Sequence, residues 1–89
     1  MKRVKVLISG IVVGIFFRRF VMHNAIRLGV NGYVKNINHK VEAVFEGNDE
    51  QVDNLIELCR QGPVGSKIEK VEVKEEKYKG EFKSFEVIR

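Results

Sequence analysis

The stretch Gly10–Arg19, GIVVGIFFRR, places two glycines in an apolar run that ends in two arginines. Glycines admit backbone conformations closed to other residues, and such a turn can direct successive N–H groups into one hollow. Arg18 adds a permanent cation whose forked donors suit phosphate or carboxylate. The stretch therefore predicts an anion-binding loop. The competing interpretation is an ordinary glycine-containing turn followed by surface arginines, and these residues alone leave both open.

The surrounding pattern places this stretch between a strand and a helix. Residues Val4–Ser9 are rich in β-branched side chains and predict a strand. The next residues repeat at three- and four-residue steps, which predicts an amphipathic helix with one packing face, and Gly29 is placed to end it. The residues of that face are Phe17, Phe20, Val21, Asn24, Ala25 and Leu28. A helix starting here would add its free N–H groups and positive dipole end to the anion site.

The rest of the chain predicts a hairpin, a second helix and two more strands. Strands Val30–Asn36 and Val41–Glu46 are joined by the short turn Ile37–Lys40. Asn48 has the features of a helix N-cap, with Gln51 closing a capping box. The second helix would bury Val52, Leu55, Ile56 and Cys59, end at Gly62–Pro63, and be followed by strands Ile68–Lys77 and Phe82–Ile88.

This order of elements predicts an α+β fold of the ferredoxin-like βαββαβ type. In that sandwich two helices pack on one face of a four- to five-stranded antiparallel sheet. The length of 89 residues indicates one domain spanning residues 1–89.

Composition excludes several classes of protein. The apolar run Val4–Phe17 is interrupted by Lys5, Ser9 and glycines, so we expect no membrane span, and without a small-residue cleavage site no signal peptide. The single cysteine, Cys59, cannot form an internal disulfide, which favours the cytoplasm. The net charge of +4 favours anionic partners but does not choose between nucleic acid and phosphorylated metabolites.

Two motifs resemble the acylphosphatase family. The family signature Gly-x-Val-Gln-Gly-Val-x-Phe-Arg is matched in SGIVVGIFFRRF at Gly10, Val12, Gly14, Phe17 and Arg18. The second family motif, Gly-Trp-Val-x-Asn, is similar to GYVKN, which ends at Asn36 and has tyrosine in place of tryptophan. The spacing of the two motifs fits, EGNDEQVDNLIELCRQGP resembles the family's second helix, and the similarity extends over essentially the whole chain.

The resemblance implies hydrolysis of acyl phosphates to a carboxylate and inorganic phosphate. It assigns phosphate binding to Arg18 and to the loop backbone, and it assigns orientation of the attacking water to Asn36. The loop residues implied are Val13, Gly14, Ile15, Phe16, Phe17 and Arg18. No metal and no cofactor are expected in the family. We accordingly expect a cytoplasmic monomer that acts on a small-molecule acyl phosphate and binds neither nucleic acid nor membrane.

One departure keeps alternatives open. The family glutamine is Val13 here, so a non-catalytic phosphate- or acyl-phosphate-binding domain of the same fold is the second hypothesis. A regulatory metabolite-binding domain of this fold would dimerise and would not need Asn36. An RNA-binding module is a weaker alternative, because KGEFKSF (Lys79–Phe85) has a glutamate where the RNA-recognition motif has its first aromatic residue.

The remaining reactive residues receive structural interpretations. His23 and His39 lack partners at metal-binding spacing, so we expect no metal site. Cys59 falls on the apolar face of the second predicted helix, where packing is the expected role. Arg19 is expected to be a surface residue and not a second phosphate ligand.

Overall fold

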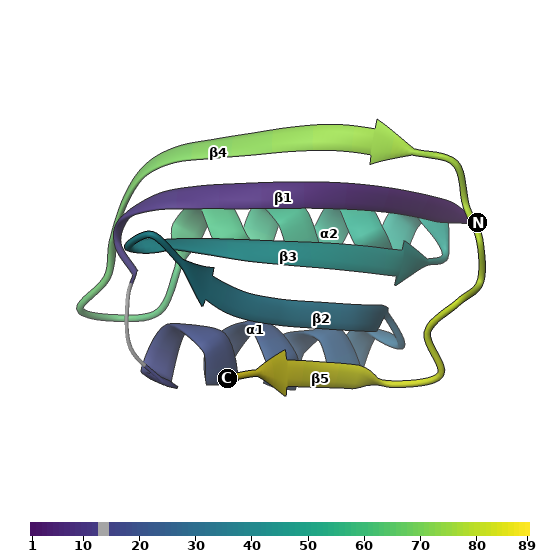
Figure 1. The fold of residues 1–89 in the computed structure, drawn as a ribbon, viewed down its shortest axis with the longest axis horizontal. Coiled ribbons are helices and arrows are strands. Elements are labelled where there is room, and N and C mark those ends of the chain that lie inside the picture. The colour runs from purple at the N-terminus through teal and green to yellow at the C-terminus, as the bar shows by residue number, and fades with distance from the viewer. Residues whose placement is uncertain (13–14) are drawn as a thin grey trace.

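The computed structural model of the protein describes residues 1–12 and 15–89, so the expected loop residues Val13 and Gly14 lie outside the described part. In these residues five strands and two helices follow one another in the expected order (Figure 1). They are β1 (Lys2–Ile11), α1 (Ile15–Leu28), β2 (Asn31–Ile37), β3 (Lys40–Gly47), α2 (Asp49–Gln61), β4 (Lys67–Glu76) and β5 (Phe85–Ile88). The ferredoxin-like α+β fold is confirmed.

The strands form one sheet in the order β4-β1-β3-β2-β5. Four of them pair antiparallel, but β5 lies parallel to β2, with Phe85 opposite Gly32 and Ile88 opposite Lys35. The sheet is therefore mixed, and the expectation of a wholly antiparallel sheet needs this correction. The physical reason is the path of the chain: the connection after β4 crosses the end of the sheet from one edge to the other, so β5 re-enters beside β2 in the same direction (Figure 1).

Both helices cover the same face of the sheet (Figure 1). α1 packs on β2 and β5, and α2 packs on β1, β3 and β4. The core lies between these layers, and the predicted helix faces supply it. Buried residues are Phe17, Val21 and Ala25 from α1, and Val52, Leu55, Ile56 and Cys59 from α2. They meet buried side chains of the sheet, among them Val4, Val6, Ile8, Val34, Val41, Ala43 and Phe45.

The helix starts differ from each other and partly from expectation. Asn48 caps α2, and its side chain accepts a hydrogen bond from the Glu50 N–H at 3.0 Å. Gln51 does not complete a capping box in the described structure, because its side-chain oxygen accepts from Asn54 instead. Asp49 and Glu50 also place negative charge at this positive helix end, which stabilises it. α1 has no acidic residue in its first turn.

The hairpin and the last strand also differ in their limits. Ile37 and Lys40 still pair, so the β2–β3 turn consists of Asn38 and His39 alone, with φ of 49° and 64°. Positive φ at both positions is the mark of a type I′ hairpin turn. β5 begins at Phe85 and not at Phe82, because the residues before it belong to the connection that crosses the sheet end.

Candidate active site

Three connections lie at one end of the sheet (Figure 1). β1 leaves for α1 there, the β2–β3 turn reverses there, and α2 leads into β4 there. The strand register fixes which residues share this end. Ile8 of β1 lies opposite Val41 of β3, and Val41 lies opposite Asn36 of β2. Ile8, Val41 and Asn36 thus lie in one row across the three strands, and Ile8 is the last residue of β1 that pairs with β3.

Gly10 shapes the exit of β1. A β-bulge falls between Ser9 and Gly10 in the pairing with β4, and Gly10 has a φ of +133°. A side chain at this position would collide with the backbone of β4 at Lys67. Only glycine fits both the conformation and the close approach. Because a bulge bends its strand and changes the direction of the chain beyond it, Gly10 directs the backbone toward α1, as its position in the motif predicts.

Arg18 is the fourth residue of α1. The first four N–H groups of a helix lack an intrahelical acceptor, and in α1 these belong to the segment from Ile15 to Arg18. The Nε atom of Arg18 is buried and has no hydrogen-bond partner among residues 1–12 and 15–89. Free N–H groups, the positive helix end and a guanidinium whose buried Nε finds no partner in the described residues together make this an anion-binding environment. Ile15, Phe16 and Phe17, also predicted to line the site, lie in the same first turn.

Asn36 is the last helix-facing residue of β2. Residues two apart on a strand share a face, and Gly32 and Val34, which precede it on this face, are buried under the helices. The Asn36 Oδ1 atom is likewise buried, and it finds no hydrogen-bond partner within the described ranges. The side chain thus brings a polar amide into a row that is otherwise apolar, beside Val41 and Ile8.

These two atoms are exceptional in the described structure. Buried polar side-chain atoms are nearly always hydrogen-bonded, and each exception calls for an explanation. Here the exceptions are a donor on Arg18 and an acceptor on Asn36, and among the described side chains no other buried nitrogen or oxygen lacks a partner. A bound anion and a bound water would satisfy them respectively. The arrangement can therefore hold an anion at the start of α1 and a water at the end of β2.

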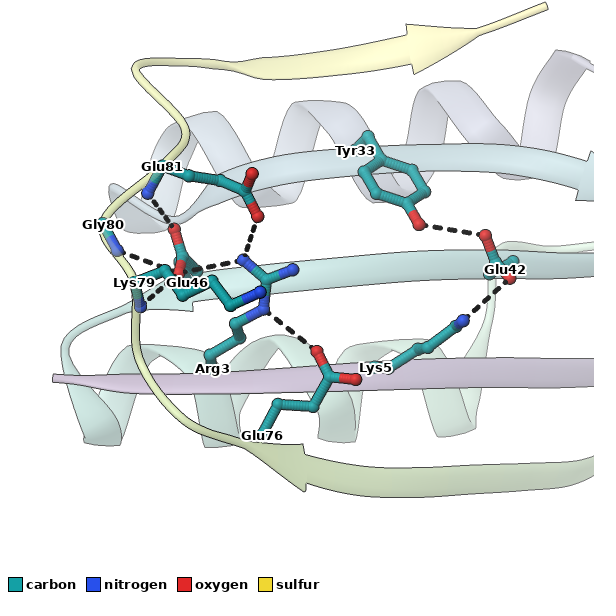
Figure 2. A network of polar contacts seen from close by, with 9 residues as sticks. All are labelled: Arg3, Lys5, Tyr33, Glu42, Glu46, Glu76, Lys79, Gly80 and Glu81. Atoms are coloured by element: carbon teal, nitrogen blue, oxygen red, sulfur yellow. Dashed lines mark hydrogen bonds and ion pairs between the residues drawn. The ribbon is translucent and has the colours of Figure 1, made fainter.

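Tyr33 does not share this face. It is the residue that replaces the family tryptophan, and it lies on the opposite side of β2, where its hydroxyl donates to Glu42 at 3.0 Å (Figure 2). Burial and that hydrogen bond raise the pKa of Tyr33 to about 12. Its ring packs edge-on against Phe82 at 5.9 Å between centroids. Tyr33 thus stabilises the open face of the sheet and does not contact the site from there.

Other reactive residues lie apart from the site. Burial raises the pKa of the Cys59 thiol to about 12, so it stays protonated at neutral pH and packs in the core, as predicted. Arg19 is exposed. Within the described ranges, no group of three His, Cys, Asp or Glu side chains could hold a metal ion. None of the helices in that part of the chain is long and apolar enough to cross a membrane.

The sequence patterns do not identify one segment that borders the site. They mark Gly62–Pro63 only as a helix end, yet the turn Pro63–Ser66 lines a hollow of about 260 Å³ together with Val12, Phe16 and Phe17. The sequence feature that could have pointed to this segment is Val64, an apolar residue that stands between turn-forming residues. By contrast, Lys79–Phe85, the segment considered for RNA, forms the connection that leads into the edge strand β5 and ends on the first residue of that strand, so it lies on no central strand.

Known proteins share the sequence family and the fold of this chain. The family model for acylphosphatase matches residues 4–87. An acylphosphatase of Syntrophus aciditrophicus (strain SB) is 48% identical over 89 residues, which cover 99% of this chain and 93% of that protein. The crystal structure of acylphosphatase from Bacillus subtilis has the same fold (27% identity, all of both chains covered, TM-score 0.94). So does the structure of an acylphosphatase from Coxiella burnetii (32% identity, 98% of this chain and 92% of that chain covered, TM-score 0.91). The chain belongs to the acylphosphatase family of hydrolases.

Proposed function

We propose that the chain hydrolyses acyl phosphates with the start of α1 holding the phosphoryl group and Asn36 holding the attacking water. The observation that carries the proposal is a pair of buried atoms, Arg18 Nε and Asn36 Oδ1, for which residues 1–12 and 15–89 provide no hydrogen-bond partner. Arg18 and the loop backbone, from Val13 to Arg18, would bind the phosphoryl oxygens and balance their charge. Asn36 would fix the position of water.

The chemistry needs little else from the protein. An acyl phosphate is a mixed anhydride, so the water oxygen bonds to phosphorus while the bond from phosphorus to the bridging oxygen breaks. The electron pair leaves with the carboxylate, whose conjugate acid has a pKa of about 4, so no general acid is required at neutral pH. Catalysis then rests on holding the phosphoryl group, balancing its charge and placing water in line.

Asn36 suits the water-holding role because its amide has two functions. The buried Oδ1 accepts a hydrogen bond from the water, and the NH₂ group can donate to a phosphoryl oxygen. The proton released by the water passes to a phosphate oxygen of the substrate. The remaining parts of the proposal, a cytoplasmic monomer that needs no metal or cofactor and binds no nucleic acid, follow from the family resemblance and the composition.

Hydrolysis of benzoyl phosphate, followed by its ultraviolet absorbance, tests the proposal. We expect turnover that persists in the presence of a chelator and competitive inhibition by inorganic phosphate, which occupies the same site. Loss of activity with chelator and recovery with a divalent ion would overturn the metal-free mechanism. Phosphate binding without any turnover would instead support the second hypothesis, a non-catalytic phosphate-binding domain, for which Val13 is the argument.

A further inference from the structure

We propose that the hollow beside the phosphate-binding loop binds the acyl group of the substrate. The enzyme would then prefer acyl phosphates with an aromatic or extended hydrocarbon group over acetyl phosphate. This inference rests on the proposed function, because it takes the phosphoryl group to bind at the start of α1. It assigns substrate preference to Ile11, Phe16 and Val64.

The hollow is lined mainly by apolar side chains, and it opens next to the first turn of α1. Its volume is about 260 Å³, and its walls come from the exit of β1, the first turn of α1 and the turn between α2 and β4. Val12 and Phe17 form its buried floor, whereas Phe16 is 83% exposed and Ile11 is 67% exposed. Large apolar side chains left in water on two sides of one hollow indicate a surface that an apolar ligand covers.

The third wall is a rigid turn. The Ser66 N–H and hydroxyl both donate to the Pro63 carbonyl, at 3.1 and 2.6 Å. Gly65, with a φ of +90°, occupies the position where type II turns place a glycine. Just before this turn, α2 ends with a hydrogen bond that the Gly62 N–H donates to the Leu58 carbonyl. The turn therefore holds Val64 fully exposed at its tip beside the hollow, in a conformation fixed before any ligand arrives.

The position of the hollow matches in-line displacement. The attacking water and the leaving oxygen must lie on opposite sides of the phosphorus. Asn36 lies on β2, and the Pro63–Ser66 turn leads into β4; in the sheet order β4-β1-β3-β2 these are on opposite sides of β1, whose exit carries the loop. Water held by Asn36 would attack from the β2 side, so the acyl group departs toward the β4 side, where the hollow lies.

Two variants test the hollow without altering the residues assigned to phosphate binding. Val64→Ser and Ile11→Ser each remove apolar surface from its walls, and Ile26→Ser removes an exposed isoleucine from α1 outside it. We expect each wall variant to lower kcat/KM for benzoyl phosphate about three- to tenfold, mainly through KM, because apolar contact with the acyl group is lost. Acetyl phosphate kinetics and the inhibition constant of inorganic phosphate should stay within about twofold of the native values.

Val64→Leu and Ile26→Ser serve as controls and should retain the native preference for benzoyl over acetyl phosphate. Equal effects of the wall variants on both substrates, or no effect on benzoyl phosphate, would overturn the acyl-group hollow while leaving the proposed function intact. A native protein that hydrolyses neither substrate would overturn the proposed function, and with it this inference.

Discussion

Two arginines stand near the two ends of β1 and have opposite surroundings. Arg3, at its start, is buried and its guanidinium meets three carboxylates: Glu46 at 3.2 Å, Glu76 at 3.0 Å, and Glu81 (Figure 2). Arg18, beyond its end, has a buried Nε with no partner in the described ranges. Burial alone lowers the pKa of Arg3, but hydrogen bonds to these carboxylates outweigh it and raise that pKa above its ordinary value.

The end of β1 where Arg3 pairs with carboxylates, called the paired end below, is also where the last connection of the chain is held to the sheet. Glu46 is only 3% exposed and accepts hydrogen bonds from three successive backbone N–H groups, those of Lys79, Gly80 and Glu81, at 3.0 to 3.1 Å (Figure 2). These bonds fasten the connection between β4 and β5 to the end of β3. A buried charge whose partners all come from the protein contributes to structure, whereas a buried polar atom without one is available to a ligand. This contrast predicts different consequences for substitutions at the two ends.

The largest expected effect on activity is that of Arg18→Ala. It should abolish detectable turnover and weaken phosphate binding by several kcal/mol, because a charge-assisted contact to the anion is lost. The free energy of unfolding should not fall, since no protein partner of Nε is left unpaired in the described structure. Steady-state kinetics, phosphate titration and thermal melting measure the three quantities.

Arg19→Ala is the matched control for Arg18→Ala. Arg19 is the next residue of α1 and is exposed, so its loss should lower the rate by less than about tenfold. If the two variants behave alike, a specific role for Arg18 is wrong. A marked loss of stability in Arg18→Ala would also contradict the contrast between the two ends.

Asn36→Ala separates binding from chemistry. It should lower kcat by roughly two to three decades, the cost of losing one positioned polar group, while phosphate affinity changes little. Asn54→Ala, which removes an exposed amide from α2, should leave both unchanged. A large loss of phosphate affinity with turnover otherwise intact would reverse the assignment and place Asn36 on the phosphoryl oxygens.

At the paired end, Glu46→Gln should reduce stability and leave the chemistry intact. Losing the carboxylate weakens the bonds to Arg3 and to the three N–H groups, so the free energy of unfolding should fall by about 2–3 kcal/mol. The value of kcat for the folded protein should remain within about twofold of native. Glu57→Gln is the control, because Glu57 is exposed on α2 and, among the described residues, its carboxylate forms an ion pair with Arg60 alone, at 3.8 Å. A large loss of kcat in folded Glu46→Gln would show that the two ends are coupled.

The same carboxylate predicts how stability depends on pH. Burial alone would raise the pKa of Glu46, but hydrogen bonds from Lys79, Arg3 and Gly80 lower it below 4.5. A carboxyl with a lowered pKa in the folded state contributes stability above its unfolded pKa and loses it as the pH falls through the folded value. Chemical denaturation between neutral pH and the region below 4.5 should therefore show less loss on acidification in Glu46→Gln than in the native chain.

Local patterns were sufficient to predict the order of elements. Helix faces repeat every three to four residues and strands are rich in β-branched residues, so these features can be recognised within short windows. The Arg3 network could not be recognised in this way, because Glu46, Glu76 and Glu81 lie 43, 73 and 78 residues away along the chain. The parallel pairing of β5 was missed for the same reason: the connection that sets its direction is held to the sheet by Glu46.

The candidate site was predicted in part, and from motifs more than from local pattern. Glycine at position 10 already indicated a special backbone conformation, and the structure gives it a bulge and a positive φ. The burial of the Asn36 oxygen was not predictable, because it depends on the register across β1, β3 and β2. The turn Pro63–Ser66 borders the loop only through packing of segments about 50 residues apart, which no motif records.

The smallest expected effect is that of Val13→Gln, which restores the amide of the family signature. The loop is proposed to bind phosphate through backbone N–H groups, which any residue compatible with its conformation supplies. A β-branched valine is stiff at χ1 and can support a loop by apolar packing where a glutamine would use hydrogen bonds. The change should therefore alter kcat/KM less than about tenfold, or under roughly 1.4 kcal/mol of transition-state stabilisation. Kinetics of the two proteins side by side decide the matter. A rise of about a hundredfold or more would mean that Val13 impairs the site, and that Arg18 and Asn36 alone do not make an efficient enzyme.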